Sequence, residues 1–283
     1  MKFLARPPLE ALAQARDRWT PLFFQHGRLE VDDSSVQWLG ADGTVYRIPV
    51  ATLSCILLGP GTTVTHAAIC ACSDSNTPIC WIGDETMRFY TMGQSATNDS
   101  ENARLQASFA GHRTKSADIA RRMFAIRFDD EEIVKGKTIQ ELRGMEGIRV
   151  RQQYAQLGAE FGVPWKARSY DVNCWHLADD INRAISAANA ALYSMVTSLI
   201  VSLGFLPQLG FIHTSHMLSF TFDIADIFKA ETSFTAAFAV VKEKPNPNAL
   251  EESVLERLKE LIEKEKLFTR IPKTIFQLFE RNL

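Results

Sequence analysis

A long stretch without charge limits what this chain can fold into. Residues 184–222 contain no Lys, Arg, Asp or Glu. Such a stretch has to be buried, and its first half is long enough to cross a bilayer. Six Ser, Thr and Asn residues interrupt that half, however, and Gly204 and Pro207 end it. We interpret residues 180–203 as a helix buried inside a soluble domain, and we expect no membrane partner.

The character of the chain changes at a short polar segment, residues 93–100. Before it, short alternating or apolar runs separated by Gly, Pro and Asp turns are typical of β-strands. After it, apolar residues recur at helical spacing. The pattern predicts an α+β protein with an N-terminal all-β domain at 1–92, a linker at 93–100 and a C-terminal all-α domain at 101–283. The predicted strands are 22–24, 28–31, 36–39, 44–48, 53–58, 79–82 and 87–92; the predicted helices are a short one capped by Thr65, and 105–128, 138–161, 180–203 and 250–266.

Charge and cysteine content narrow the classes of function. The formal net charge of -2 means that a nucleic-acid partner would have to meet a local basic patch. Five cysteines without a Cys-x-x-Cys pair favour reduced, mostly buried thiols over a disulfide framework or a zinc site. The N-terminus has no apolar run long enough for a signal peptide. We therefore expect a cytoplasmic protein with a packed core.

The segment from Gly210 to Lys229 carries the most distinctive chemistry. Its second half reads as a helix on which Asp223, Asp226 and Lys229 recur every three residues, so that they share one face. The loop before this helix carries His213 and also His216. Two carboxylates with an imidazole nearby are ligands suited to Mg²⁺ or Mn²⁺. The alternative is a capped helix with solvated aspartates, and this segment alone leaves both interpretations open.

A further carboxylate, Glu146, falls on the inward stripe of the predicted helix 138–161. Leu142 lies four residues before it and Val150 four residues after it. A buried carboxylate is costly unless it is paired or bound to a metal. The alternative to a metal ligand is a carboxylate paired with Arg143 or Arg149.

Basic residues are concentrated in the middle of the chain, where they would suit phosphate contacts beside a metal site. The alternative is an ordinary solvated face balanced by residues 129–132, and spacing alone does not separate the two. The basic residues that we expect to contact DNA are Arg121, Arg122, Arg127, Arg143 and Arg149.

Four blocks of sequence, in order, carry a resemblance to a known family. They are Pro60-Gly-Thr-Thr-Val-Thr-His-Ala-Ala68, Gln140-Glu-Leu-Arg-Gly-Met-Glu-Gly147, Gly210-Phe-Ile-His213 and Leu218-Ser-Phe-Thr-Phe-Asp-Ile-Ala-Asp226. With these blocks the chain resembles the CRISPR-associated integrase family, the endonuclease subunit of spacer acquisition, and most closely its type I-E branch. The similarity spans nearly the whole chain.

The resemblance implies an N-terminal β domain and a C-terminal helical catalytic domain in a homodimer. It implies a divalent ion, Mg²⁺ or Mn²⁺, held by Glu146, His213 and Asp226, with Asp223 supporting catalysis. His216 departs from the branch pattern, in which a lysine is expected, and this puts one phosphate or base contact in doubt. The positions that match DNA-handling residues of similar proteins are Arg88, Tyr170, Tyr193 and Lys229.

The activity implied by the resemblance is insertion of captured DNA fragments into a CRISPR array. A 3′-hydroxyl of the fragment would attack a phosphate of the array, so that the reaction is a transesterification. The expected partners are double-stranded and branched DNA and a small ferredoxin-like CRISPR-associated subunit. Two alternatives stay open: a stand-alone metal-dependent nuclease of branched DNA repair intermediates, and a non-catalytic nucleic-acid scaffold whose acidic cluster is structural.

Overall fold

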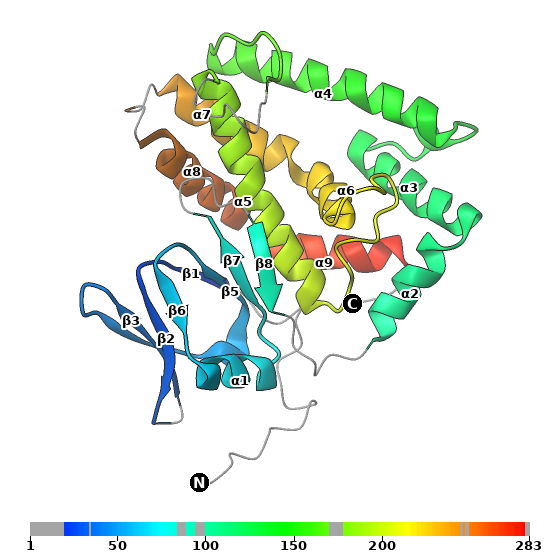
Figure 1. Cartoon of the computed structure of the whole chain (residues 1–283). Helices are drawn as coiled ribbons and strands as arrows, with labels where there is room; N and C mark the ends of the chain where they lie inside the picture. Colours follow the sequence, from blue (N-terminus) through cyan, green and yellow to red (C-terminus); the bar gives the residue numbers. More distant parts are fainter. Residues whose placement is uncertain are drawn as a thin grey trace.

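The structure, a computed structural model, describes residues 20–33, 35–83, 89–93, 100–169, 178–243, 246 and 249–280. Figure 1 shows strands in the first part of the chain and helices in the rest. The predicted α+β fold is therefore confirmed. Most of the segment predicted as a linker lies outside the described residues, between Gly93 at the end of the last strand and Ser100 before the next helix.

Two four-stranded sheets make up the N-terminal part. One has the order β1-β5-β7-β8, in which β1, β5 and β7 are parallel and β8 is antiparallel to β7. The other has the order β4-β3-β2-β6, in which β2, β3 and β4 form antiparallel hairpins and β6 is parallel to β2. The strands are β1 (Thr20–Phe24), β2 (Gly27–Asp32), β3 (Ser35–Gly40), β4 (Val45–Ile48), β5 (Leu53–Leu58), β6 (Thr62–Val64), β7 (Ile79–Ile82) and β8 (Phe89–Gly93).

The short helix predicted after Thr65 is present within the strand-rich N-terminal part. It is helix α1 (His66–Asp74) between β6 and β7, and the Thr65 hydroxyl accepts a hydrogen bond from the Ala68 N–H at 3.3 Å. The helix packs on β2, and Ala68 and Cys72 belong to the core between the sheets. Strand β6 was not predicted, because three residues are too few to show an alternating pattern.

Strand β5 is buried on both faces and connects the N-terminal part to the helical part. Successive side chains of a strand point to opposite faces. Ile56 and Leu58 enter the core between the sheets and α1, whereas Cys55 and Leu57 belong to a second buried cluster on the other face. Helix α5 (Asp180–Ser202) contacts β5, β7 and β8. Sheet β1-β5-β7-β8 thus lies between the other sheet and α5 (Figure 1).

Helix α5 is also the centre of the helical part, where it packs against α6, α7, α8 and α9. Within the described ranges it is the one helix long and apolar enough to span a membrane, and 83% of its apolar window is buried inside the protein. This burial agrees with the interpretation of residues 180–203 as a core helix. The other helices are α2 (Glu101–Ala110), α3 (Arg113–Phe128), α4 (Ile139–Phe161), α6 (Ser219–Phe228), α7 (Thr235–Lys242), α8 (Leu250–Lys264) and α9 (Leu267–Leu278).

The predicted helix 105–128 is two helices. The chain breaks between α2 and α3 at Gly111 and His112, where the His112 backbone is extended and its ring accepts from the Lys115 N–H at 3.4 Å. The predicted start of α4 is confirmed, because Thr138 and Glu141 form a reciprocal capping box. Helices α7 and α9 were not predicted.

Candidate active site

The loop before α6 is folded onto that helix by one carboxylate. Asp223 is completely buried. Its Oδ2 accepts hydrogen bonds from the Phe211 N–H at 2.6 Å and the Ile212 N–H at 3.0 Å, and its Oδ1 accepts from the His213 N–H at 2.9 Å. Three backbone donors therefore solvate the charge of Asp223 and fix the path of residues 211–213.

The same carboxylate orients the His213 ring. His213 Nδ1 lies 2.7 Å from Asp223 Oδ1. Because an ionised carboxylate only accepts, Nδ1 carries the proton and Nε2 keeps its lone pair. A carboxylate behind a histidine in this way is the arrangement that prepares imidazoles for metal binding.

Gly210 is required by the close approach of the loop to α6. A Cβ atom at this position would lie 2.2 Å from the His213 carbonyl oxygen and 2.7 Å from Ser219 Cβ. His213 is held by Asp223, and Ser219 is part of α6. A larger residue at position 210 would therefore push His213 out of place.

Three of the predicted residues converge on one cavity of about 490 Å³. Glu146 comes from α4, His213 from the loop and Asp226 from α6. The cavity is also lined by Arg127 of α3 and by His216. The predicted convergence of Glu146, His213 and Asp226, which are far apart in the sequence, is thus what the structure shows.

Both acidic residues of the cavity, Glu146 and Asp226, are paired with neighbours one helical turn away. Glu146 forms a two-pronged ion pair with Arg149, whose Nε and Nη2 each lie 2.8 Å from a carboxylate oxygen. Asp226 pairs with Lys229 at 2.5 Å, and the Lys229 ammonium lies 4.8 Å from the centre of the Tyr193 ring. The sequence analysis gave pairing with an arginine as the alternative to a metal ligand at Glu146. The structure shows the pair with Arg149, and Glu146 also lines the cavity.

Charge interactions decide the ionisation of Asp226. Burial by itself would raise the pKa of this carboxyl, but Lys229 and Arg127 lower it by more, so that the pKa lies below its usual value. The pKa of Lys229 is correspondingly raised, because its attraction to Asp226 outweighs the effect of burial. The pair is therefore fully charged near neutral pH.

One predicted role needs correction. Arg127 was expected to contact DNA, but its side chain is only 2% exposed, and it lies on the buried stripe of α3 with Met123 and Phe124. Asp223, expected to support catalysis, is completely buried behind His213, and any effect it has on the cavity passes through that ring. The signal for Arg127 was present in the sequence, because it lies four residues after Met123 on an apolar stripe.

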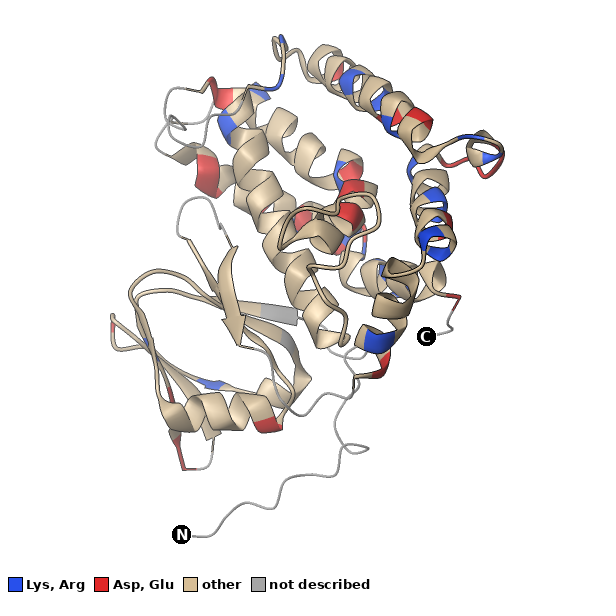
Figure 2. Cartoon of the chain, turned by 45° about the vertical axis from the view of Figure 1, so that its right-hand side comes forward, with Lys and Arg blue, Asp and Glu red and all other residues tan. Residues whose placement is uncertain are grey.

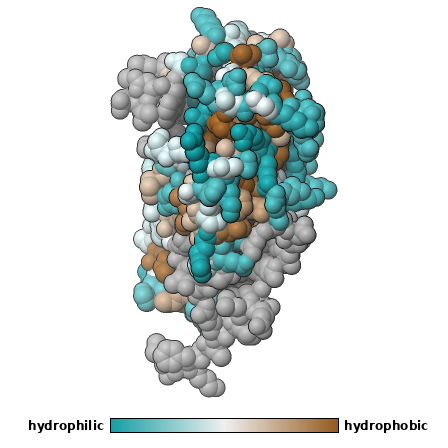
Figure 3. Space-filling model, turned by 90° about the vertical axis from the view of Figure 1, so that its right-hand side faces the viewer, coloured by the Kyte–Doolittle hydropathy of each residue, from teal (hydrophilic) through white to brown (hydrophobic). Residues whose placement is uncertain are grey.

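The remaining basic candidates lie on or near helices α3 and α4, along which Lys and Arg are spread (Figure 2). Arg143 donates a hydrogen bond to the Ile212 carbonyl, and Arg121 pairs with Asp118 at 3.0 Å. The face that Figure 3 turns toward the viewer is largely hydrophilic with some hydrophobic residues between. Arg88 and Tyr170 lie outside the described residues.

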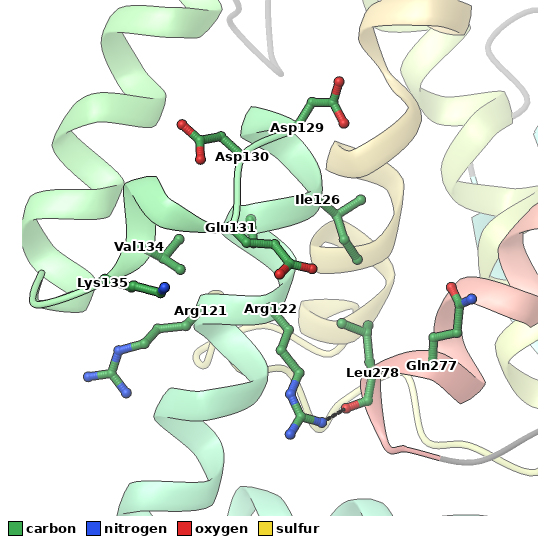
Figure 4. Close-up of a pocket in the computed structure, with 11 residues that line it drawn as sticks. Arg121, Arg122, Ile126, Asp129, Asp130, Glu131, Val134, Lys135, Gln277 and Leu278 are labelled. Carbon is green, nitrogen blue, oxygen red and sulfur yellow. Dashed lines mark hydrogen bonds between the residues drawn. The ribbon is translucent and has the colours of Figure 1, made fainter.

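Arg121 and Arg122 border a second cavity, of about 680 Å³, between α3 and α9 (Figure 4). Arg122 donates to the Leu278 carbonyl at 2.7 Å and pairs with Glu280. The acidic residues of the turn after α3, Asp129, Asp130 and Glu131, line the same cavity. This part of the basic region is therefore mixed in charge, as the alternative of a balanced solvated face anticipated.

His216, where the family pattern has a lysine, is held by a hydrogen bond and a ring contact. Its Nδ1 accepts from the Leu218 N–H at 3.0 Å, and its ring lies against Phe222 with the ring centres 4.9 Å apart. In the neutral ring Nε2 then carries the proton. His216 therefore offers a hydrogen-bond donor at the cavity in place of a lysine's charge.

The donor set fits a divalent ion in chemistry, but it is not gathered around one point. His213 Nε2 lies 4.0 Å from Asp226 Oδ2. The guanidinium of Arg127 lies between the two carboxylates, with Nη1 3.5 Å from Asp226 and 3.9 Å from Glu146. Across the part of the chain that the structure describes, no three His, Cys, Asp or Glu side chains are arranged closely enough to hold an ion. Two carboxylates and an oriented imidazole remain the ligand types that Mn²⁺ or Mg²⁺ prefers.

Comparison with known proteins identifies a family. The sequence matches the family described as "CRISPR associated protein Cas1" over residues 22–130 and 125–253. It is 40% identical over 239 residues to "CRISPR-associated endonuclease Cas1 2" of Chlorobaculum tepidum, covering 84% of this chain and 80% of that protein. It is 36% identical over 230 residues to "CRISPR-associated endonuclease Cas1" of Escherichia coli (strain K12), covering 81% and 75%. Among solved structures, a "TtCas1-DNA complex" has a TM-score of 0.76 and 37% identity, covering 95% of this chain and 98% of that one.

The role of Asp223 as a positioning residue is open to a direct test. Asp223→Asn replaces one of the two acceptor oxygens by an NH₂ group that only donates, so that either the Phe211 and Ile212 N–H groups or the His213 N–H group loses its acceptor. We expect the free energy of unfolding to fall by roughly 2–5 kcal/mol and these amide hydrogens to exchange with solvent much faster, as hydrogen exchange would show. Asp226→Asn is the matched control and should leave their exchange slow. Unchanged protection in Asp223→Asn would contradict the assignment.

Proposed function

We propose, from the premise that the chain belongs to the CRISPR-associated Cas1 family, that it is a metal-dependent DNA endonuclease and integrase. In this proposal it joins captured DNA fragments to a CRISPR array by transesterification. The observation that carries the proposal is the convergence of Glu146, His213 and Asp226 on one cavity from two helices and a loop. The names of the relatives, which are endonucleases, and the DNA-bound relative TtCas1 support it.

The residues that would hold the divalent ion are Glu146, Asp226 and His213 through Nε2. When bound, such an ion supplies electrostatic stabilisation of the charge that develops on the reacting phosphate. The 3′-hydroxyl oxygen of the fragment forms a bond to phosphorus while the bond to the leaving oxygen breaks, so one phosphodiester replaces another and no ATP is needed. In this proposal Asp223 keeps the proton on His213 Nδ1, which holds Nε2 available as a ligand.

Positive side chains beside the ligands would bind the DNA phosphates. Lys229 lies next to Asp226 and Tyr193, and Arg149 lies next to Glu146. The partly exposed Arg121 on α3 and the exposed Arg143 on α4, which also lines the cavity, extend the positive charge along the two helices. Because the chain as a whole has a net charge of -2, nucleic acid would have to bind a local basic surface. These side chains provide such a surface. The proposed partners are double-stranded and branched DNA and a small ferredoxin-like CRISPR-associated subunit.

The ligand assignment predicts the effect of three substitutions on strand transfer. Glu146→Gln and Asp226→Asn keep size but remove ligand charge, and His213→Ala removes a ligand. Each should slow joining of a fragment with a free 3′-hydroxyl to a repeat-containing plasmid by about a hundredfold or more, because the lost stabilisation is worth several kcal/mol. The assay contains Mg²⁺ or Mn²⁺ and the small partner.

The control for this assay is Glu160→Gln, an exposed carboxylate on the same helix as Glu146, which should join DNA at the wild-type rate. Joining that persists in excess EDTA would contradict the metal mechanism, and wild-type rates in all three variants would show that the site is placed wrongly. Cutting of branched DNA without any joining, whether or not the small partner is present, would favour the stand-alone nuclease instead.

The basic helices predict a salt effect. Arg121→Ala should weaken DNA binding across all sequences and make the slope of log affinity against log salt shallower by about 0.9, the value for one lost phosphate contact. Lys264→Ala, an exposed basic residue on α8, is the control for a general change in charge. If Arg121→Ala has the affinity and slope of the control, Arg121 belongs to an ordinary solvated face.

Assembly is the other proposed property. Strands β4 and β8 are sheet edges, and Tyr46 on β4 and Tyr90 on β8 are 57% and 63% exposed. Exposed edges with large apolar side chains are suited to pairing with another copy. We expect a stable homodimer without DNA, seen by light scattering as about twice 31.8 kDa at micromolar concentration. A mass of one chain under these conditions would rule it out.

A further inference from the structure

We infer that Arg127 is the resident cation of the active site: in the ion-free protein its guanidinium keeps Glu146 and Asp226 in place, and a divalent ion binds by displacing it from them. The inference deepens the proposed function and rests on it, because it concerns the same two ligands. It assigns to Arg127 a positioning role in place of the DNA contact expected from the sequence.

The burial of Arg127 requires a compensating arrangement. A guanidinium taken out of water costs several kcal/mol unless its charge is matched. The charge of Arg127 is compensated on α6, where Nη2 donates to the Asp223 carbonyl oxygen at 2.8 Å and Nη1 faces the Asp226 carboxylate. It is also compensated on α4, where the same Nη1 faces the Glu146 carboxylate. This one side chain of α3 therefore links the two elements that carry the carboxylate ligands.

The distances show that the link is electrostatic and loose. Nη1 lies 3.5 Å from Asp226 Oδ2 and 3.9 Å from Glu146 Oε1. Charge-assisted hydrogen bonds are shorter, at about 2.7–2.9 Å. Within the described structure, Arg127 Nε is also buried without any hydrogen-bond partner. A cation between two carboxylates that bonds tightly to neither occupies the place where an ion with short metal–oxygen bonds would be attracted.

Cations outnumber carboxylates at this site. Asp223, Glu146 and Asp226 contribute three negative charges, whereas Arg127, Arg149, Lys229 and Arg143, which also lines the cavity, contribute four positive ones. A divalent ion added to this set meets the repulsion of Arg127 at close range. Arg127 therefore does two things at once: it prevents the carboxylates from repelling each other in the free protein, and it lowers their affinity for the ion.

Arg149 provides a matched comparison, because it pairs with the same Glu146. Its side chain is 24% exposed and bonds to that carboxylate directly, whereas Arg127 is buried between both carboxylates. Removing Arg149 leaves the central cation in place. Only the loss of Arg127 should make the site depend on an added ion.

The experiment compares full-length wild type, Arg127→Met and Arg149→Met. The midpoint of thermal unfolding is measured in EDTA and in saturating Mn²⁺, and the Kd for Mn²⁺ is measured by calorimetry. We expect Arg127→Met to unfold at a lower temperature in EDTA, to recover most of that loss in Mn²⁺, and to bind Mn²⁺ about tenfold or more tightly than wild type, because a nearby positive charge is gone. Arg149→Met should show clearly smaller changes in both quantities.

The outcomes separate the inference from the proposed function. If wild type and Arg127→Met bind Mn²⁺ with the same Kd and gain the same stability from it, Arg127 is merely structural and the inference is overturned. If wild type binds no Mn²⁺ with or without DNA, the metal assignment itself fails and the inference fails with it.

A second measurement covers the case in which Arg127→Met does not fold. Wild-type protein labelled with ¹⁵N-arginine is titrated with Mg²⁺, and the side-chain Nε–H signal of Arg127 is followed. The signal should move with the same binding curve that calorimetry gives for Mg²⁺. A signal that stays in place at saturation would overturn the inference, since the ion would then bind without disturbing the guanidinium.

Discussion

The candidate active site depends on the buried carboxylate of Asp223. A charge at this depth is tolerated because the N–H groups of residues 211–213 and the His213 ring all donate to it. The same bonds bend the loop back over α6, which Gly210 allows by leaving room for the backbone. Stability and function are thus coupled here, because the interaction that satisfies Asp223 is also the one that aims His213 into the cavity.

Charge pairing is the second constraint on the site. Acidic and basic side chains from α3, α4 and the α6 region meet around the cavity, and Glu146 and Asp226 each have a cation one helical turn away. Those local pairs compensate the charge of Glu146 and Asp226, and both residues still line the cavity. The buried Arg127 is different, because it joins separate helices and so connects the state of the site to the packing of the helical part.

Helix α5 provides the frame on which the site is built. It packs on a β-sheet on one side and on α6 to α9 on others, so it has almost no surface left for charged residues. Thr197 of α5 and Thr221 of α6 share a buried hydrogen bond of 3.0 Å, which adds a polar contact to the apolar packing. The position of Asp223 and Asp226 therefore follows from how α6 is docked on this helix.

Local spacing was enough to predict several features from the sequence. The uncharged residues 184–222 indicated a buried helix, apolar residues at helical spacing from Thr138 onward predicted α4, and the interval between Asp226 and Lys229 placed both on one helical face. Each of these depends on a pattern within one segment of the chain, whose geometry the helix itself sets. The convergence of Glu146, His213 and Asp226 came from the family resemblance, since spacing alone left it open.

Only the tertiary structure decided the partners of residues far apart in the sequence. Arg127 was expected to contact DNA; its spacing from Met123 placed it on an apolar stripe, but its partners depend on how α3 packs against α4 and α6. The order of the strands and the role of Asp223 behind His213 were decided in the same way. Such contacts join segments through the core, where burial and charge matching outweigh the local preferences that a sequence displays.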